Sequence, residues 1–207
     1  MRAALRVLQL GLWAVALLAA GYLSYVALDR MIYEKQQANR LRELTRLASI
    51  ATSPVVASRP TAMAPPAAAS PPPENGAPIG RLEIPSAGIS VIVAAGTDDL
   101  TLQRGVGHID GTALPGEPGN IALAGHRDTV FRGLRKLRPA DLIFLVTPSG
   151  SFEYAVESLQ TVEPERTDVL DASSHPTLTL VTCYPFDFIG PAPLRFIVRA
   201  REVGRFH

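Results

Sequence analysis

The chain has 207 residues, enough for one ordinary domain with additional segments. Hydrophobic residues make up 47% and charged residues 19% of it, which excludes a disordered or highly charged protein. The net charge of +1 does not indicate nucleic-acid binding. The single cysteine excludes an internal disulfide and a metal site of several thiolates. Since no group of carboxylates resembles a metal site, we predict neither a metal nor another cofactor.

A short tail, residues 1–6, precedes an uncharged and mostly apolar run at residues 7–28. As a helix, this run is about 33 Å long, which is enough to cross the hydrocarbon core of a membrane. The alternative is a cleaved signal peptide with Arg2 and Arg6 in its basic start. Because the run is long for a signal peptide and charged, helix-favouring residues follow it directly, we predict an uncleaved transmembrane helix.

The charges beside this span leave its orientation open. Two arginines precede it and five basic residues follow it within residues 29–50, so the positive-inside rule does not favour an outward C-terminus. Residues 29–50 place leucines on one side of a helix and charges elsewhere. This pattern predicts a helical stalk or a dimerising helix.

Residues 51–78 have the composition of a linker. Eight of these 28 residues are proline and eight are alanine, and only Arg59 and Glu74 are charged. Repeated prolines remove backbone donors and favour the extended polyproline II conformation. We therefore expect no core in this segment, which is suited to holding the next domain away from a membrane.

Residues 79–203 are typical of short strands separated by turns. Residues 152–157 alternate large apolar side chains with smaller or charged ones, and a Pro-Ser-Gly turn precedes them, which predicts a strand in a hairpin. The other predicted strands are 81–84, 89–94, 120–124, 142–147, 177–183 and 194–200, with helical turns near 98–103 and 131–137. Many short strands and few helices indicate a mainly β fold, a closed or partly closed barrel.

Cys183 ends the apolar run TLTLVTC. A side chain at a strand end faces the rim of a barrel, where a thiol is usable as a nucleophile if a base deprotonates it. Most lone cysteines are buried and inert instead. The position of the residue alone leaves both interpretations open.

His126 ends a second apolar run, NIALAGH, and Arg195 opens the run LRFIVRA. A histidine can exchange a proton with a thiol and with a leaving amine near neutral pH. If the strands of Cys183 and Arg195 pair antiparallel, the guanidinium lies beside the thiol, where it favours the thiolate and can bind an oxyanion. Each residue alone also fits an ordinary structural position, but together the three predict a catalytic site. The remaining histidines, in turns or at the chain end, are weaker candidates: His108, His175 and His207.

Three segments resemble those of the sortase family, and most of all its class D members: GHIDGTALPGEPGNIALAGHRDT, TLTLVTCYPF and PLRFIVRA. The resemblance covers residues 79–200, nearly all of the predicted globular part. It implies an eight-stranded sortase β-barrel on the outer side of the cytoplasmic membrane, anchored by the N-terminal helix. It also implies a transpeptidase in which Cys183 cleaves the Thr–Gly or Thr–Ala bond of an LPXTG-like sorting signal through a thioacyl intermediate. An amine acceptor, a cell-wall peptide or another protein, then resolves this intermediate; His126 is the acid and base, and Arg195 holds the substrate and the oxyanion.

Four neighbouring residues are further candidates. Thr182 can donate a backbone or hydroxyl hydrogen bond beside the nucleophile. Asp128 can orient the histidine loop, or cap the turn that follows it. Tyr184 and Phe186 lie on the loop after the nucleophile, where they either line a site for an apolar Leu-Pro peptide or pack the loop itself.

Two other functions fit the same residues. If water rather than an amine resolves the thioester, the protein is a membrane-tethered cysteine peptidase. If the thiol is inert, the protein is a tethered β-domain that binds surface peptides without chemistry.

Overall fold

The computed structural model describes residues 73–206 and a set of helical residues between 9 and 39. Among these described residues, no helix is both long enough and apolar enough to cross a membrane. The predicted membrane span and stalk lie partly outside the described residues, and the predicted linker is described only from Pro73 onward.

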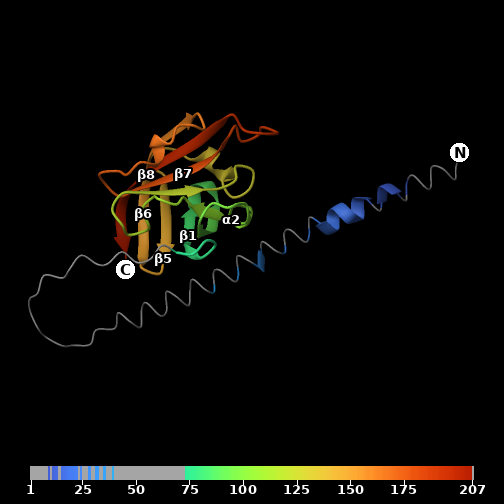
Figure 1. Ribbon diagram of the computed structural model, residues 1–207, viewed down its shortest axis with the longest axis horizontal. Helices are drawn as coiled ribbons and strands as arrows, with labels where there is room; N and C mark the ends of the chain where they lie inside the picture. Colours follow the sequence, from blue (N-terminus) through green and yellow to red (C-terminus); the bar gives the residue numbers. More distant parts are fainter. Residues whose placement is uncertain are drawn as a thin grey trace, which may run out of the picture. The chain divides into compact units, whose positions relative to one another are not determined.

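The residues from 73 to 206 contain eight strands and a few short helices (Figure 1). The strands are β1 (Pro78–Ile84), β2 (Ile89–Ala95), β3 (Val106–His108), β4 (Asn120–Ala124), β5 (Leu142–Thr147), β6 (Gly150–Val162), β7 (Thr177–Tyr184) and β8 (Leu194–Phe206). The helices are α2 (Asp99–Arg104) and the 3-10 helices η1 (Pro85–Ala87), η2 (Arg132–Lys136) and η3 (Asp168–Leu170).

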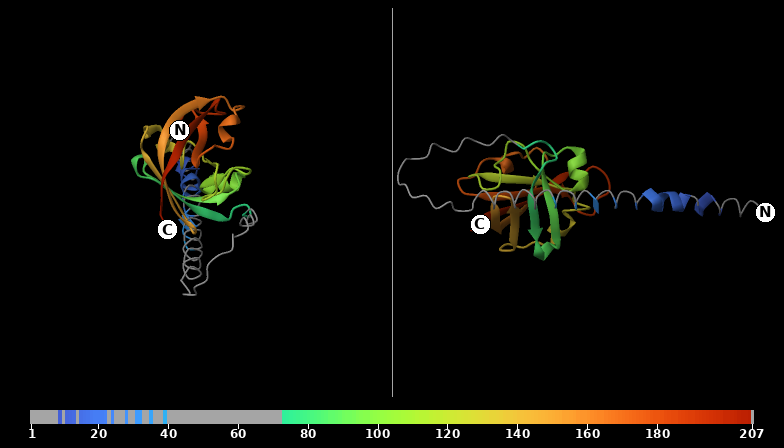
Figure 2. Two further views of the ribbon diagram at one scale, coloured as in Figure 1. Left: turned by 90° about the vertical axis from the view of Figure 1, so that its left-hand side faces the viewer. Right: turned by 90° about the horizontal axis from the view of Figure 1, so that it is seen from below.

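The strands close into one barrel in the order β1-β2-β3-β4-β7-β8-β6-β5. The pairs β2–β3 and β4–β7 are parallel, and the other neighbouring strands are antiparallel. Figure 2 shows from two further sides how the strands curve around their common interior. The predicted mainly β fold with a closed eight-stranded barrel is confirmed.

The interior follows from the alternation of side chains along each strand. On β6, Phe152, Tyr154 and Val156 point inward and are buried, whereas the glutamates between and after them lie nearer to solvent. Each of the eight strands contributes apolar side chains to this interior, and β3 contributes Val106 alone. Phe131 and Leu134, from the segment around η2, complete it. Each fully buried Leu, Ile or Phe contributes roughly 1.5–3 kcal/mol, so this interior dominates the stability of the barrel.

β3 is absent from the strands predicted from sequence. Its sequence, VGH, offers no alternating pattern over the length that a strand prediction needs. The strand nevertheless pairs with β2 and β4 on its two sides. At Gly107 an added Cβ would lie 2.3 Å from the backbone oxygen of Gly96, so this close packing requires glycine.

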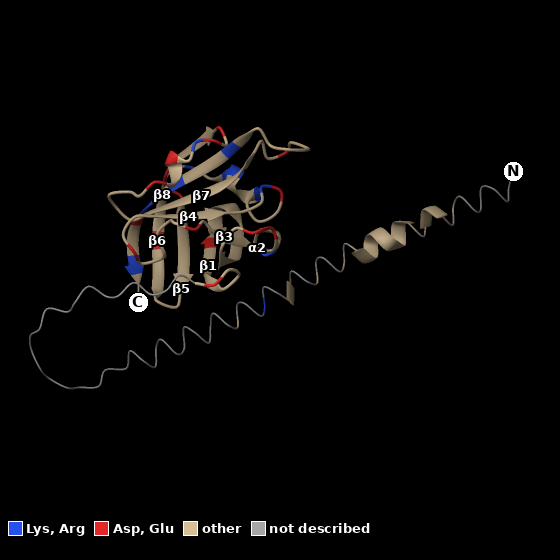
Figure 3. Cartoon of the chain, in the orientation of Figure 1, with Lys and Arg blue, Asp and Glu red and all other residues tan. Residues whose placement is uncertain are grey.

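Charges of both signs are interspersed over the outside of the barrel (Figure 3). The ion pairs there include Arg201 with Glu157 at 3.0 Å and Arg205 with Glu202 at 3.2 Å. Surface pairs of this kind each contribute about 0–1 kcal/mol. They keep the surface soluble but add little to the stability that the core supplies.

The buried tyrosine of the core gives a first prediction. The Tyr154 hydroxyl is buried and, among the described residues, has no hydrogen-bond partner. Since an unsatisfied buried hydroxyl destabilises the folded state, Tyr154→Phe is expected to leave the free energy of unfolding near pH 7 unchanged or raise it by about 1 kcal/mol. Urea unfolding of the two proteins measures this difference, and a clear loss of stability in the variant would contradict it.

The same substitution changes how the free energy of unfolding depends on pH in the alkaline range. Burial, and then the negative charge of Glu202, raise the pKa of Tyr154 well above its usual value of 10.0. The folded state therefore holds this proton more tightly than the unfolded chain, so the stability linked to it is complete below pH 10 and is lost as the pH rises above that value. We expect Tyr154→Phe to lose less stability than the parent protein between about pH 9 and pH 11.

Candidate active site

The pairing of β7 with β8 brings two of the predicted site residues together. Cys183 is the Cα partner of Arg195 in this antiparallel ladder. Directly opposite residues point to the same face of a sheet, with Cβ atoms about 4.5–5.5 Å apart. The antiparallel pairing expected from sequence is therefore present, and the side chains of Cys183 and Arg195 start side by side.

Cys183 lies on the outer face of the barrel. Leu178 and Leu180 of β7 are fully buried in the interior, and Thr182 continues that parity, so the residue after it points outward. The thiol is free and half-buried.

A second, smaller apolar cluster covers the outer face next to this thiol. It contains Val162, Val169 and Ile197, with Leu170 and Val181 packed against them. Two of these residues come from η3, in the segment 163–176 between β6 and β7. This cluster covers Val181 of β7 and Ile197 of β8, two residues before Cys183 and two residues after Arg195.

β4 lies parallel to β7, with Ala124 opposite Val181. Two hydrogen bonds continue this alignment beyond the end of β4. The Gly125 N–H donates to the Val181 oxygen at 3.2 Å, and the Thr182 hydroxyl donates to the Gly125 oxygen at 2.7 Å. The next residues on the two segments are the histidine and the cysteine of the predicted site, which therefore lie at the same end of neighbouring strands.

The backbone of His126 is held on its other side as well. Its carbonyl accepts a hydrogen bond from the N–H of Phe131 at 3.0 Å, and Phe131 is fully buried. At Gly125 an added Cβ would lie 2.8 Å from the Phe131 ring, so only glycine allows this close turn. The imidazole itself is exposed. A fixed backbone with an exposed ring suits a residue that exchanges protons with a bound molecule.

Arg195 is half-buried, and its side chain folds back over the start of β8. Its Nη1 atom donates to the backbone oxygens of Ala192 at 3.3 Å and Leu194 at 3.1 Å. These two bonds use one of the three guanidinium nitrogens. Since the guanidinium carries five N–H donors, donors remain for a bound carbonyl or oxyanion.

Two of the neighbouring candidates lie close to this histidine loop. Thr182 is buried and its hydroxyl is bonded to the Gly125 oxygen, so it supports the backbone that carries the histidine. Asp128 is exposed two residues after the histidine. Its predicted role in orienting that loop stays a prediction.

The two aromatic candidates pack with a third ring. Tyr184 stacks on Phe196 with ring centroids 6.1 Å apart, and Phe186 meets Phe196 edge-on at 5.2 Å. Phe186 and Phe196 also pack against the interior of the barrel. These contacts fit the structural interpretation of the aromatic pair, and their contact with a peptide remains a prediction.

Arg127 is a site residue that the sequence reasoning did not single out. Its Nη2 atom donates to the backbone oxygens of Phe188 at 2.7 Å and Gly190 at 3.0 Å, which lie between β7 and β8. The signal in the sequence is its place directly after the predicted base, in AGHRDT. A charge at that position has no interpretation without the fold that brings the loop beside it.

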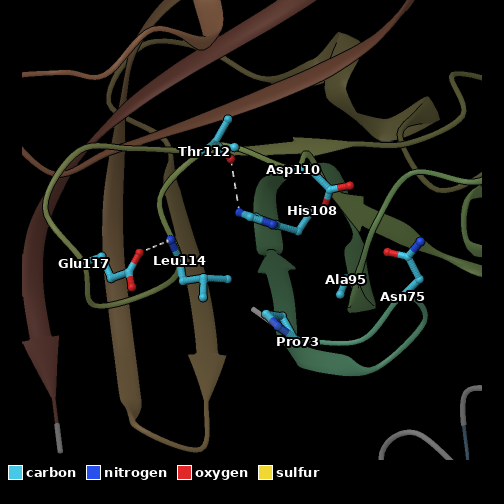
Figure 4. A pocket seen from close by; sticks show the side chains of 9 residues that line it. Pro73, Asn75, Ala95, His108, Asp110, Thr112, Leu114 and Glu117 are labelled. Atoms are coloured by element: carbon cyan, nitrogen blue, oxygen red, sulfur yellow. Dashed lines mark hydrogen bonds between the residues drawn. The ribbon is translucent and has the colours of Figure 1, made fainter. Parts of the chain in front are cut away.

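His108 belongs to a different part of the barrel. It is buried, and its Nε2 atom lies 2.9 Å from the Ala113 oxygen and 3.1 Å from the Thr112 hydroxyl (Figure 4). It lines a cavity of about 460 Å³ together with Asp110 and Glu117. This cavity is built largely from the segment that precedes β4, and neither Cys183, His126 nor Arg195 lines it.

The comparison with protein families identifies the family to which this fold belongs. The sortase domain family matches residues 82–203, which is more than half of the chain. Sortase D of Bacillus subtilis (strain 168) is 33% identical over 199 residues, which cover 96% of this chain and 98% of that protein. Sortase A of Bacillus anthracis is 30% identical over 109 residues, 51% of each chain.

Solved structures show the same similarity. The structure of a Clostridium perfringens sortase D5 transpeptidase matches with a TM-score of 0.65 and 27% identity, over 83% of this chain and 99% of that one. The structure of sortase C-1 from Actinomyces oris matches with a TM-score of 0.57 and 32% identity, over 61% of this chain.

Proposed function

The chain belongs to the sortase family of cysteine transpeptidases, and on that premise we propose that it cleaves an LPXTG-like sorting signal after its threonine and joins the released acyl group to an amine. The observation that carries this proposal is the register of three strands. β7 and β8 pair Cys183 with Arg195, while β4 delivers His126 to the same end of β7.

In the first half of the reaction, the Cys183 thiolate attacks the carbonyl carbon of the threonine. The carbonyl oxygen becomes an oxyanion, and the free N–H groups of Arg195 stabilise it. His126 gives a proton to the departing amine, because an amine leaves only as a neutral group. The peptide bond breaks, and a thioester between the threonine and Cys183 remains.

In the second half, an amine acceptor attacks the thioester and gives its proton to His126. The tetrahedral intermediate collapses, the thiolate leaves, and a new amide joins the two molecules. The second half restores the thiolate and the protonated imidazole that the first half consumed, so the enzyme is ready for another cycle. The exposed imidazole and the half-buried thiol support these two reaction steps, because both peptides must reach the site from solvent.

The cellular setting follows from the same proposal. A sorting signal and a cell-wall or protein acceptor meet outside the cytoplasmic membrane, so the barrel acts there, attaching proteins to the cell surface. The uncharged run at residues 7–28 supports anchoring in the membrane, and the Pro- and Ala-rich segment that follows supports a tether between anchor and barrel.

A ligation assay tests the function. A fluorescent peptide that contains Leu-Pro-X-Thr-Gly, with X varied, is incubated with the protein and with acceptor peptides that present a terminal or side-chain amine. We expect a product whose mass is that of the peptide acid ending at its threonine plus that of the acceptor, less one water. Peptide left intact at every X and acceptor would contradict the proposal.

The same assay separates the alternative function. Release of the free acid at saturating acceptor, with no ligated product, would identify a membrane-tethered cysteine peptidase that hydrolyses the same intermediate. Both outcomes share the thioester, so only the acceptor distinguishes them.

A further inference from the structure

The segment 185–193, here called the β7–β8 loop, connects the strand of Cys183 to the strand of Arg195. It projects from the barrel in Figure 1 and carries a strongly exposed apolar tip, with Phe188 45% and Ile189 97% exposed. Side chains so exposed contribute little to holding a loop in one conformation. Three arginines bind this loop from the elements around it: Arg135 through Asp187, Arg195 through Ala192, and Arg127 through Phe188 and Gly190.

Arg127 makes the central one of these attachments. A single nitrogen, Nη2, donates to two backbone oxygens two residues apart, at 2.7 and 3.0 Å. Its guanidinium carbon also lies 5.9 Å from the centroid of the Phe188 ring. Backbone bonds from a cation fix the path of the loop whatever its side chains are, and they are stronger than neutral hydrogen bonds.

Arg135 holds the loop through an exposed ion pair, which is a weaker interaction than the backbone hydrogen bonds of Arg127. The Arg135 Nη1 atom lies 3.2 Å from a carboxylate oxygen of Asp187, but the two side chains are 39% and 74% exposed. Water and salt screen such a pair. Arg127 is half-buried, and its Nη1 atom is fully buried with no hydrogen-bond partner among the described residues. A buried guanidinium N–H without a partner is unfavourable for folding, which points to a role beyond stability.

The position of Arg127 in the chain gives that role. It directly follows His126, whose carbonyl accepts a hydrogen bond from Phe131 and whose neighbour Gly125 is hydrogen-bonded to β7. The Arg127 side chain therefore joins the histidine loop to the loop that lies between Cys183 and Arg195. We propose that Arg127 is a positioning residue: it holds the β7–β8 loop against the histidine loop, so that the two together form one side of the binding site for the sorting peptide. This inference rests on the proposed function.

Kinetics with the sorting peptide test the proposal. Arg127→Gln removes the cation and its forked donors, and it is expected to raise KM by roughly ten-fold or more while kcat changes less than about three-fold, since peptide binding is lost and the chemical groups are intact. Arg127→Lys keeps the charge and donors on a shorter side chain and should recover part of the loss. The matched control Arg135→Gln, which also removes a cation from this loop, should change KM less than about three-fold.

Two measurements need no peptide. Chymotrypsin should cut after the exposed Phe188 several times faster in Arg127→Gln than in the parent protein, while cleavage after the buried Phe131 stays slow in both, which shows that the barrel is intact. The rate of Cys183 alkylation by iodoacetamide should be the same in both proteins, because Arg127 acts on the loop and not on the thiol.

The outcomes separate this inference from the function on which it rests. If the parent protein turns over no LPXTG-like peptide, the proposed function fails, and cleavage after Phe188 still decides whether Arg127 holds the loop. Equal cleavage of Phe188 in Arg127→Gln and the parent, or an unchanged KM in a protein that does turn over the peptide, overturns the inference. A slower alkylation of Cys183 in Arg127→Gln than in the parent protein would show that Arg127 acts on the thiol, and it would overturn the inference as well.

Discussion

Replacing Cys183 with alanine is expected to abolish transpeptidation, with kcat/KM falling by roughly 10⁴-fold or more to the background rate. The reason is that the acyl group must be carried covalently between two peptides, and the chain has one cysteine to carry it. A ligation assay at high enzyme concentration measures the residual rate. The substitution removes a single half-buried sulfur atom at the end of a strand, so we expect little change in the melting temperature.

Cys183→Ser is the informative companion variant. It keeps the size and a hydroxyl, but a serine hydroxyl needs a stronger base than a thiol does, so we expect almost no ligation here as well. Ligation by either variant at a rate near that of the parent protein would show that the thiol is not the acyl carrier.

Replacing His126 with alanine is expected to lower kcat/KM by roughly 10²–10⁴-fold, the range for loss of a general acid and base. The imidazole is exposed and its backbone is fixed by Gly125 and Phe131, so the substitution removes a proton carrier without removing a core contact. Ligation rates measured over a range of peptide concentrations give this ratio. Added imidazole should restore part of the rate in His126→Ala.

His175→Ala is the matched control for this prediction. His175 lies between β6 and β7, where its ring contacts the Ser174 hydroxyl at 3.3 Å. Its removal is expected to change the rate less than about two-fold, as for most substitutions away from a site. An equal loss of activity in the two variants, or full activity in His126→Ala, would contradict the role proposed for His126.

The strands with a clear apolar pattern could be predicted from the sequence. β4 and β5 lie where they were expected, and β7 extends one residue further, to Tyr184. β6 and β8 are longer than predicted because they pair with each other along most of their length, with two irregularities in register. Within the barrel, the C-terminal half of β6 pairs only with β8, and β8 beyond Arg201 pairs only with β6. The local sequence carries no sign of this pairing.

The proposed catalytic residues could be selected from the sequence because each stands at a strand end. The antiparallel neighbourhood of Cys183 and Arg195 follows from two strands joined by a short loop, which is a local property of the chain. The place of His126 depends on the parallel pairing of β4 with β7, which are separated by more than fifty residues. The sequence alone offered a histidine at a strand end as one of the proposed catalytic residues, and the resemblance to sortases implied its role as acid and base.

Arg127 could not be found in the same way. Its hydrogen bonds reach residues 61 and 63 positions away, at backbone oxygens that belong to no motif. The role of the Thr182 hydroxyl is similar, since it depends on where the Gly125 oxygen lies in the folded protein. Contacts between a side chain and a distant backbone have no signature in residue type or spacing.

Intact mass spectrometry of the protein tests most directly whether Cys183 carries the acyl group. The protein is mixed with an LPXTG-like peptide without acceptor, quenched in acid and weighed, and peptide mapping then locates the modification. We predict a mass increase equal to the peptide acid ending at its threonine less one water, located on Cys183, absent in Cys183→Ala and discharged when an amine is added. Ligation of such peptides without this adduct, or with the adduct on another residue, would contradict the proposal that Cys183 carries the acyl group.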